Sequence, residues 1–188
     1  MKKTFPVLLA FSLFIVSCNN EASDSVEKAD SANEAKMDNN QTPSSDQASA
    51  DFLVKAADGG MAEVECGQLA QSKATNAKVK SFGSMMVNDH TGANAQVKSL
   101  AAARNITLPT SVSEEHKKNK DELSKKSGAD FDKAYMDQMV SDHEKTISLF
   151  ERASGDVNDA EVKTFADNTL PKLRMHLDSA RAIRSSLK

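Results

Sequence analysis

Apolar residues recur at three- and four-residue steps through most of the chain after residue 50, and this spacing constrains the fold more than any other feature. Steps of this size place side chains on one face of a helix. The pattern predicts long helices at about residues 51–72, 76–104, 130–153 and 158–187, with a short polar helix at about 113–126. Two helix pairs joined by a longer connection are typical of ferritin-like bundles. We therefore predict an all-α, ferritin-like four-helix bundle over residues 51–188, with a short extra helix in the central connection.

Two adjacent glycines, Gly59 and Gly60, stand inside the first predicted helix. Each glycine in a helix interior costs about 1 kcal/mol relative to alanine. A close crossing of another helix at this point would offset that cost, and we expect one there. The end of the second helix is also marked, because Asn105 and Pro109 are residues that stop helices.

The N-terminal residues have the pattern of an export signal. Lys2 and Lys3 precede an apolar run at residues 5–16, which is too short to span a bilayer because a spanning helix needs about 20 residues. Positive residues before a short apolar core are typical of a secretory signal. Residues 15–18, Ile-Val-Ser-Cys, resemble the bacterial lipobox, in which the cysteine is acylated and the chain is cut before it. The sequence predicts a signal peptide at residues 1–17 and a lipid on Cys18.

Residues 18–50 have a composition that differs from the rest of the chain. They are rich in Ser, Asn, Asp, Ala and Gln and contain almost no large apolar side chains. Such a segment cannot bury enough surface to offset its ordering entropy. We predict a lipidated cysteine followed by a flexible, acidic tether with an end-to-end distance of about 30 Å. The protein is then exported and anchored to a bacterial membrane. The outer membrane is favoured because Asn19 is not the aspartate that marks inner-membrane retention in some enteric bacteria.

Composition excludes several classes of function. The formal net charge is −3, and the chain has no Trp and one Tyr, so it lacks the basic, aromatic surface of a nucleic-acid-binding protein. No Ser/His/Asp order, glycine-rich phosphate loop or Cys-x-x-Cys motif is present. If Cys18 carries a lipid, Cys66 has no partner within the chain. We interpret Cys66 as a small packed helix residue, with a redox or metal-ligating role as the alternative.

Several stretches of the chain resemble one known family when they are taken together. Met86-Val-Asn-Asp-His90 and Met139-Val-Ser-Asp-His143 are two of them, and the others are residues 52–65, 131–135 and 170–176. As a set they are similar to the bacterial envelope family called domain of unknown function 4142. The resemblance covers about residues 50–187. It implies a ferritin-like four-helix fold in an exported, often lipid-anchored protein, and it implies no established activity.

Three histidines are the main candidates for chemistry. His90, His143 and His176 fall on or beside the apolar faces of three predicted helices. The first helix offers two carboxylates at similar depth, and three more adjoin the histidines, so the candidate acids are Glu63, Glu65, Asp89, Asp142 and Glu144. A carboxylate from one helix and imidazoles from three others form a plausible ligand set for Zn, Fe or Cu. The fourth histidine, His116, lies in a polar stretch and is expected to be solvated.

The same residues also permit other interpretations. A di-iron centre needs a Glu-x-x-His motif on two helices, but the residues three before the histidines are Val87, Val140 and Leu173. Ferroxidase or oxygenase activity is therefore disfavoured. Alternatively, Asp–His pairs buried between helices fix their register, with the second imidazole nitrogen accepting from a hydroxyl such as that of Tyr135. Ring nitrogens that converge within about 4–5 Å would favour metal ligation, and imidazoles that each pair with a different carboxylate would favour the structural role.

The leading functional hypothesis is a non-enzymatic envelope or stress-related module that requires no cofactor and acts through its bundle surface or an inner polar network. The second is a metal-binding protein that uses the three histidines with Glu65 or Glu63. The third is a metal-dependent oxidoreductase, disfavoured by the missing motif. The predicted partner is the membrane, through the N-terminal lipid, and nucleic acid is excluded. A protein partner or an oligomer is left open.

Overall fold

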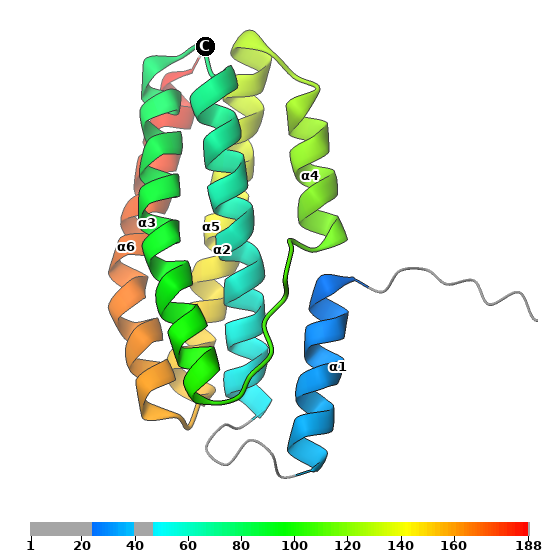
Figure 1. Ribbon diagram of the computed structural model, residues 1–188. Coiled ribbons are helices and arrows are strands. Elements are labelled where there is room, and N and C mark those ends of the chain that lie inside the picture. The colour runs from blue at the N-terminus through cyan, green and yellow to red at the C-terminus, as the bar shows by residue number, and fades with distance from the viewer. Residues whose placement is uncertain (1–23, 40–46, 188) are drawn as a thin grey trace, which may run out of the picture.

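Six helices make up the part of the chain that the structure, a computed structural model, describes: residues 24–39 and 47–187. Four long helices form the bundle (Figure 1). These are α2 (Gln47–Lys73), α3 (Ala77–Ala103), α5 (Gly128–Asp156) and α6 (Ala160–Ser186). Two shorter helices, α1 (Ser25–Asp38) and α4 (Glu114–Ser124), lie along one side of it. None of the described helices is long and apolar enough to cross a membrane.

The order of the helices follows the predicted ferritin-like plan. Short turns join α2 to α3 and α5 to α6, so each of these pairs is antiparallel (Figure 1). The long connection from α3 climbs the side of the bundle through α4, and α5 therefore runs parallel to α3. One long crossover of this kind is a feature of ferritin-like bundles. The all-α bundle and the extra helix in its central connection are confirmed.

The helix ends have local causes in the sequence. Asn76 caps α3 by accepting from the Lys78 backbone N–H at 2.9 Å, and Asp159 caps α6 by accepting from Val162 N–H at 3.1 Å. Such side chains satisfy backbone donors that the first helical turn leaves unpaired. Asn105 has a φ of 55° directly after α3, a left-handed conformation that Asn tolerates and that ends the helix.

Two polar clamps fix the register of the helices at opposite ends of the bundle. Asp132 on α5 is buried and accepts hydrogen bonds from the Thr75 and Asn76 backbone N–H groups, at 3.0 and 2.8 Å, in the α2–α3 turn. Arg104, buried at the end of α3, donates two hydrogen bonds to Asp159 at 2.7 and 2.5 Å. Charge-assisted and bidentate bonds of this type are geometrically specific. They hold α3 against α5 and α6, the three helices that carry the candidate histidines.

The core divides into two apolar clusters along the bundle axis. One gathers around Phe52, Phe150 and Phe165. The other gathers around Phe82 and Tyr135. On each of α3, α5 and α6 the chain passes from one cluster to the other through a histidine. The sequence therefore places a polar layer between the two apolar halves of the core.

The close helix crossing expected at the paired glycines occurs at one of them. A Cβ on Gly60 would lie 1.9 Å from Asn94 Oδ1 on α3, whereas a Cβ on Gly59 would have no atom within 4 Å. A close backbone approach between α2 and α3 lies farther along, where a Cβ on Gly67 would be 2.8 Å from the Gly83 carbonyl oxygen. The expectation is correct for Gly60 and wrong for Gly59, and it missed the crossing at Gly67 and Gly83.

The prediction of a flexible tether over residues 18–50 is wrong for residues 25–38, which form α1, and for residues 47–50, which begin α2. One large apolar side chain of α1, Met37, packs partly buried against the core. The buried Asn33 adds a polar attachment, because it donates from Nδ2 to the Thr107 carbonyl at 2.9 Å and accepts from the Thr107 N–H at 2.7 Å. Lys36 Nζ adds a bond to the Asn105 carbonyl at 2.8 Å. Residues 1–23 and 40–46, including Cys18 and the predicted signal peptide, lie outside the described residues.

Replacing Asn33 by alanine is expected to release α1 from the bundle without unfolding the rest. The substitution leaves the Thr107 backbone groups without their partners, which costs about 1–3 kcal/mol. Hydrogen exchange followed by mass spectrometry should show faster exchange across residues 25–38 and unchanged protection in α3, α5 and α6. The exposed Glu34 next to Asn33 provides the control, because Glu34→Ala should leave the exchange of α1 unchanged. Equal protection of α1 in both variants would contradict the anchoring role of Asn33.

Candidate metal centre

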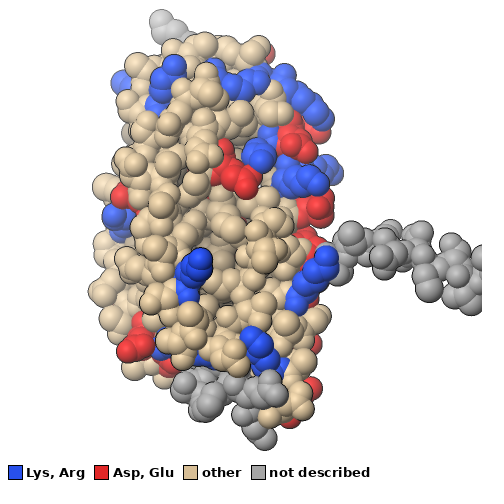
Figure 2. Space-filling view, viewed as in Figure 1, with Lys and Arg blue, Asp and Glu red and all other residues tan. Residues whose placement is uncertain are grey.

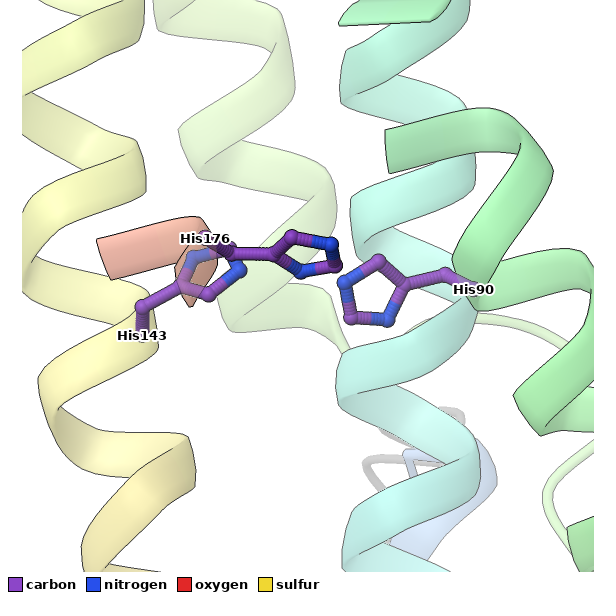
Figure 3. A group of neighbouring side chains, drawn as sticks. All are labelled: His90, His143 and His176. Atoms are coloured by element: carbon purple, nitrogen blue, oxygen red, sulfur yellow. The ribbon is translucent and has the colours of Figure 1, made fainter. Parts of the chain in front are cut away.

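Three helices bring one histidine each to a single point in the polar layer between the two apolar clusters. His90 comes from α3, His143 from α5 and His176 from α6, and their rings point toward one another (Figure 3). The ring centroids lie 5.8 Å apart for His90 and His143, 5.5 Å for His90 and His176, and 5.4 Å for His143 and His176. One nitrogen from each ring lies within 4.8 Å of the other two. The sequence-based expectation that these histidines face inward is fulfilled.

The three imidazoles are removed from solvent. His143 and His176 are each 1% exposed and His90 is 7% exposed. His90 Nε2, His143 Nε2 and His176 Nδ1 are buried and have no hydrogen-bond partner. A buried polar atom without a partner is costly, and a cation bound between the three rings would satisfy such atoms through their lone pairs.

The opposite nitrogens of two rings are held by hydrogen bonds that fix the tautomer. His143 Nδ1–H donates to the Met139 carbonyl at 2.9 Å. His176 Nε2–H donates to Asp89 Oδ2 at 2.9 Å, and Asp89 also accepts from Lys172 Nζ at 2.9 Å. Metal-bound histidines usually donate their second N–H to a carbonyl or carboxylate in this way. Both rings are thereby oriented with their unprotonated nitrogen toward the cluster.

Burial keeps the cluster neutral at physiological pH. Desolvation, followed by the charges of His143 and His176, lowers the pKa of His90 to about 3. Desolvation and then His176 lower the pKa of His143 to about 4. Desolvation also lowers the pKa of His176, although its bond to Asp89 acts in the opposite direction. Metal ligation requires neutral imidazole, and the site supplies it without releasing a proton.

The candidate carboxylates separate into different environments. Asp89 contacts the cluster through His176. Burial raises the pKa of Asp89, but its hydrogen bonds to Lys172 and His176 outweigh that effect and hold the pKa below its ordinary value. Glu63 is buried behind His143, with Oε1 3.6 Å from Nδ1, and burial followed by the charge of Asp142 raises its pKa well above the ordinary value. Neither carboxylate belongs to the group of converging ligand atoms.

Three candidate acids lie away from the cluster. Glu65 pairs with Lys120 of α4 at 2.5 Å, and Glu144 pairs with Arg181 at 2.6 Å. Both lie on the outside of the bundle, and charged side chains of both signs gather over α4 on the face shown in Figure 2. Asp142 is mostly buried and lies near Glu63, and burial raises its pKa. The expectation that Glu65 lies as deep as Glu63 is wrong. The two acids lie on different sides of α2, and Glu63 is buried whereas Glu65 is partly exposed beside α4.

The structure corrects two further expectations. The Tyr135 hydroxyl is buried and has no hydrogen-bond partner, so it is not the donor proposed for the imidazoles. His116 is partly buried, with Nε2 3.5 Å from Asp58 Oδ2, and is not fully solvated.

Cys66 is buried as a packed helix residue, and burial followed by the charges of Glu63 and Asp142 raises its pKa to about 12. A thiol with this pKa is not a thiolate at neutral pH.

Lys172 was missed among the site residues. It lies one turn before His176 on α6, a spacing that places both side chains on one face of a helix. The four-residue spacing from Lys172 to His176 would have identified Lys172. Asp89 faces the buried His176 ring, and Lys172 supplies the cation beside that carboxylate.

The comparisons identify the family. Residues 32–183 match the family model described as domain of unknown function (DUF4142), and the chain belongs to this family. Among solved structures, the fold is similar to a crystal structure of a DUF305 fragment from Deinococcus radiodurans, with a TM-score of 0.68 and 11% sequence identity. That similarity covers 76% of this chain and 99% of the fragment, and at this identity it shows the fold alone. No curated protein matches the chain.

Acid is expected to destabilise the metal-free protein partly through His90. Its pKa is about 3 in the folded state and about 6.5 in an unfolded chain. Between these values the unfolded state binds the proton and the folded state does not, so the free energy of unfolding falls as pH decreases from about 6.5. The limiting slope is about 1.4 kcal/mol per pH unit for one group. Urea denaturation of chelator-treated protein at pH 7, 6 and 5 should show a shallower fall for His90→Leu.

The control for this measurement is Met86→Leu, which alters a buried neighbour on α3 that does not titrate. Met86→Leu should retain the pH slope of the unmodified protein. Carboxylates such as Glu63 contribute in both backgrounds and do not affect the difference. The same slope in His90→Leu as in Met86→Leu would contradict a depressed pKa at His90.

Proposed function

We propose that this chain is an exported envelope protein whose bundle binds one first-row transition-metal ion through His90, His143 and His176. The observation that carries the proposal is the convergence of one ring nitrogen from each of three buried histidines, on three helices, within 4.8 Å of one another. Each of these rings also has a buried nitrogen without a hydrogen-bond partner. Pairing of each imidazole with a different carboxylate would favour a structural role, and among the described residues a hydrogen bond of this kind is present only at His176, while His143 Nδ1 lies 3.6 Å from Glu63 Oε1.

The donor set indicates which ions fit. An all-imidazole set suits Zn²⁺ and Cu²⁺ and is unlike the carboxylate-rich set of di-iron bundles. At a bond length of about 2.1 Å in tetrahedral geometry, nitrogens bound to one ion would lie roughly 3.4 Å apart. The nitrogens, which now lie within 4.8 Å of one another, would therefore approach one another by at most about 1.4 Å. A fourth position is available to water, because a cavity of about 30 Å³ borders His90 and His176, and a water needs roughly 10–15 Å³.

The surroundings favour binding over catalysis. The cavity beside the histidines is far smaller than ordinary substrate pockets, which measure about 300–1,000 Å³. The histidines also lack the Glu-x-x-His spacing of di-iron oxidoreductases, and Leu173 at the relevant position of α6 packs in the apolar core. We therefore propose that the site sequesters or stores an ion and is not enzymatic.

The test is direct titration of the chain from residue 19 to residue 188, purified without a chelating tag, with Zn²⁺, Cu²⁺ and Co²⁺. We expect one equivalent to bind, with the visible absorption of tetrahedral Co²⁺ when cobalt is used. His116→Ala is the matched control, since it removes the histidine outside the cluster and should keep the stoichiometry. Failure to take up any of the three ions would overturn the proposal and leave the cluster as a register-fixing polar layer.

We also propose that Cys18 carries the lipid that anchors the protein to the bacterial envelope, with the outer membrane favoured. The support is the lipobox-like sequence at residues 15–18 after a short apolar run. Labelling cells with a fatty-acid analogue and fractionating their membranes tests this. Cys18→Ala should abolish both label and membrane association, and Cys66→Ala should change neither. Label that persists in Cys18→Ala would contradict the assignment.

A further inference from the structure

An apolar groove lies between α2, α3 and the connection that follows α3, and none of the three histidines lines it. Its volume is about 550 Å³, within the usual range of small-molecule sites, about 300–1,000 Å³. Of the described side chains that line it, only Lys98 is charged. Its walls include the apolar side chains of Ala57, Met61, Ala101, Ala102, Ile106 and Leu108. The groove therefore suits a hydrocarbon ligand, because burial of apolar surface is the main favourable interaction that such walls offer.

The N-terminal end of α1 meets this groove at Thr110. Ser25 Oγ accepts from the Thr110 N–H at 2.9 Å, and Thr110 lines the groove. Asp24 Oδ2 accepts from the Glu114 N–H at 2.9 Å, which holds the same end of α1 against α4. The part of the chain before residue 24 is therefore joined to the bundle beside the groove.

Cys18 is close enough along the chain to place an attached group in the groove. It precedes Ser25 by seven residues, which span at most about 25 Å at roughly 3.6 Å per residue. Along α3 the groove extends from Asn94 to Ala102, a rise of roughly 12 Å at about 1.5 Å per residue. The reach of Cys18 from Ser25 is thus about twice the length of the groove along α3.

We infer that the groove holds one acyl chain of the lipid on Cys18 when the protein is outside the membrane, and this inference rests on the proposed acylation of Cys18. An acyl chain in water is unfavourable in proportion to its apolar area. A short tether raises the effective concentration of an attached group to the millimolar range, so the attached chain has an advantage over free lipid. The Lys98 side chain is exposed, so hydrocarbon in the groove does not require a charge to be buried. The acylated protein is then monomeric in water and releases the chain to a bilayer.

The test uses the full chain made in a bacterial host, purified in detergent and then transferred to detergent-free buffer. Intact mass establishes acylation, and light scattering measures the size of the particle. We expect an acylated monomer in which hydrogen exchange at residues 94–110 is slower than in unacylated Cys18→Ala. An intact mass without acyl groups would overturn this inference together with the acylation proposal. An acylated protein that forms only aggregates would overturn this inference alone.

A pair of substitutions locates the acyl chain. Ala102→Glu places a carboxylate in the groove, while Ala103→Glu is the same change at the next residue, which is also exposed and does not line the groove. We expect acylated Ala102→Glu to aggregate without detergent and acylated Ala103→Glu to stay monomeric. The same behaviour in both variants would contradict the site. A dimer of Cys18→Ala that Ala102→Glu dissociates would mean that a second copy occupies the groove, and it would overturn the inference.

Discussion

Replacing His143 by alanine is expected to lower the affinity of the bundle for Zn²⁺ or Cu²⁺ by about a hundredfold or more, beyond the range of about 10–100-fold seen for outer-shell substitutions. His143 is 1% exposed, and its Nδ1–H is held by the Met139 carbonyl, so its Nε2 is oriented before any ion arrives. Removing it leaves two imidazoles in the ligand set. Competition with a chromophoric chelator measures the loss.

Two comparisons make this result specific. Asp89→Asn should reduce the affinity by about 10–100-fold, because it weakens the orientation of His176 and does not remove a ligand. Glu144→Gln, at the adjacent position in the sequence, should leave the affinity unchanged because Glu144 pairs with Arg181 on the surface. Free imidazole should partly restore the cobalt absorption of His143→Ala by occupying the vacated space. Unchanged affinity in His143→Ala would remove His143 from the ligand set.

Replacing Gly67 by leucine is expected to lower the free energy of unfolding by about 3 kcal/mol, the upper part of the range for overpacked cores. A Cβ at Gly67 would lie 2.8 Å from the Gly83 carbonyl oxygen and 3.0 Å from Val87 Cγ2. The first of these atoms is backbone and cannot turn away, so α2 and α3 must separate. Urea denaturation monitored by circular dichroism gives the change.

Gly59→Ala is the matched control on the same helix. A Cβ there has no atom within 4 Å, so the substitution should stabilise the protein by up to about 1 kcal/mol through helix propensity. The two substitutions are therefore expected to have opposite signs. Destabilisation of similar size at both positions would mean that the distance between α2 and α3 does not determine the result.

The long helices could be predicted because each buries an apolar face with a clear period. Helix α1 could not, since its buried positions are Ala29 and Asn33. Its attachment includes two hydrogen bonds from Asn33 to the Thr107 backbone and one from Lys36 to the Asn105 carbonyl, partners that lie far away in the sequence. Composition reports how much apolar surface a segment can bury, and it does not report a specific polar contact of this kind. The close crossing of α2 and α3 at Gly67 and Gly83 likewise could not be predicted without the positions of both helices.

The histidines of the candidate site were predictable for the same reason as the helices. Each lies on or beside an apolar face, so the bundle brings all three inward. The roles of the acids depended on side-chain direction and on packing. Glu63 and Glu65 are two positions apart on α2, yet one is buried behind His143 and the other pairs with Lys120 of α4. The apolar period of α2 alone could not predict which of the two acids faces the histidines. Glu65 faces α4 instead, and the sequence does not show which side of α2 is covered by α4.

The attachment of α1 also determines how freely the bundle can turn on a lipid anchor. If Cys18 is acylated, the stretch from Cys18 to Asp24 spans at most about 22 Å, at roughly 3.6 Å per residue. Asp24 accepts from the Glu114 N–H at 2.9 Å, where α1 meets α4. An anchor at Cys18 would therefore lie within about that distance of the side of the bundle that carries α1 and α4. The flank formed by α1 and α4 would face the headgroups, and the opposite flank, formed by α3 and α6 (Figure 1), would be presented to whatever approaches from the aqueous side.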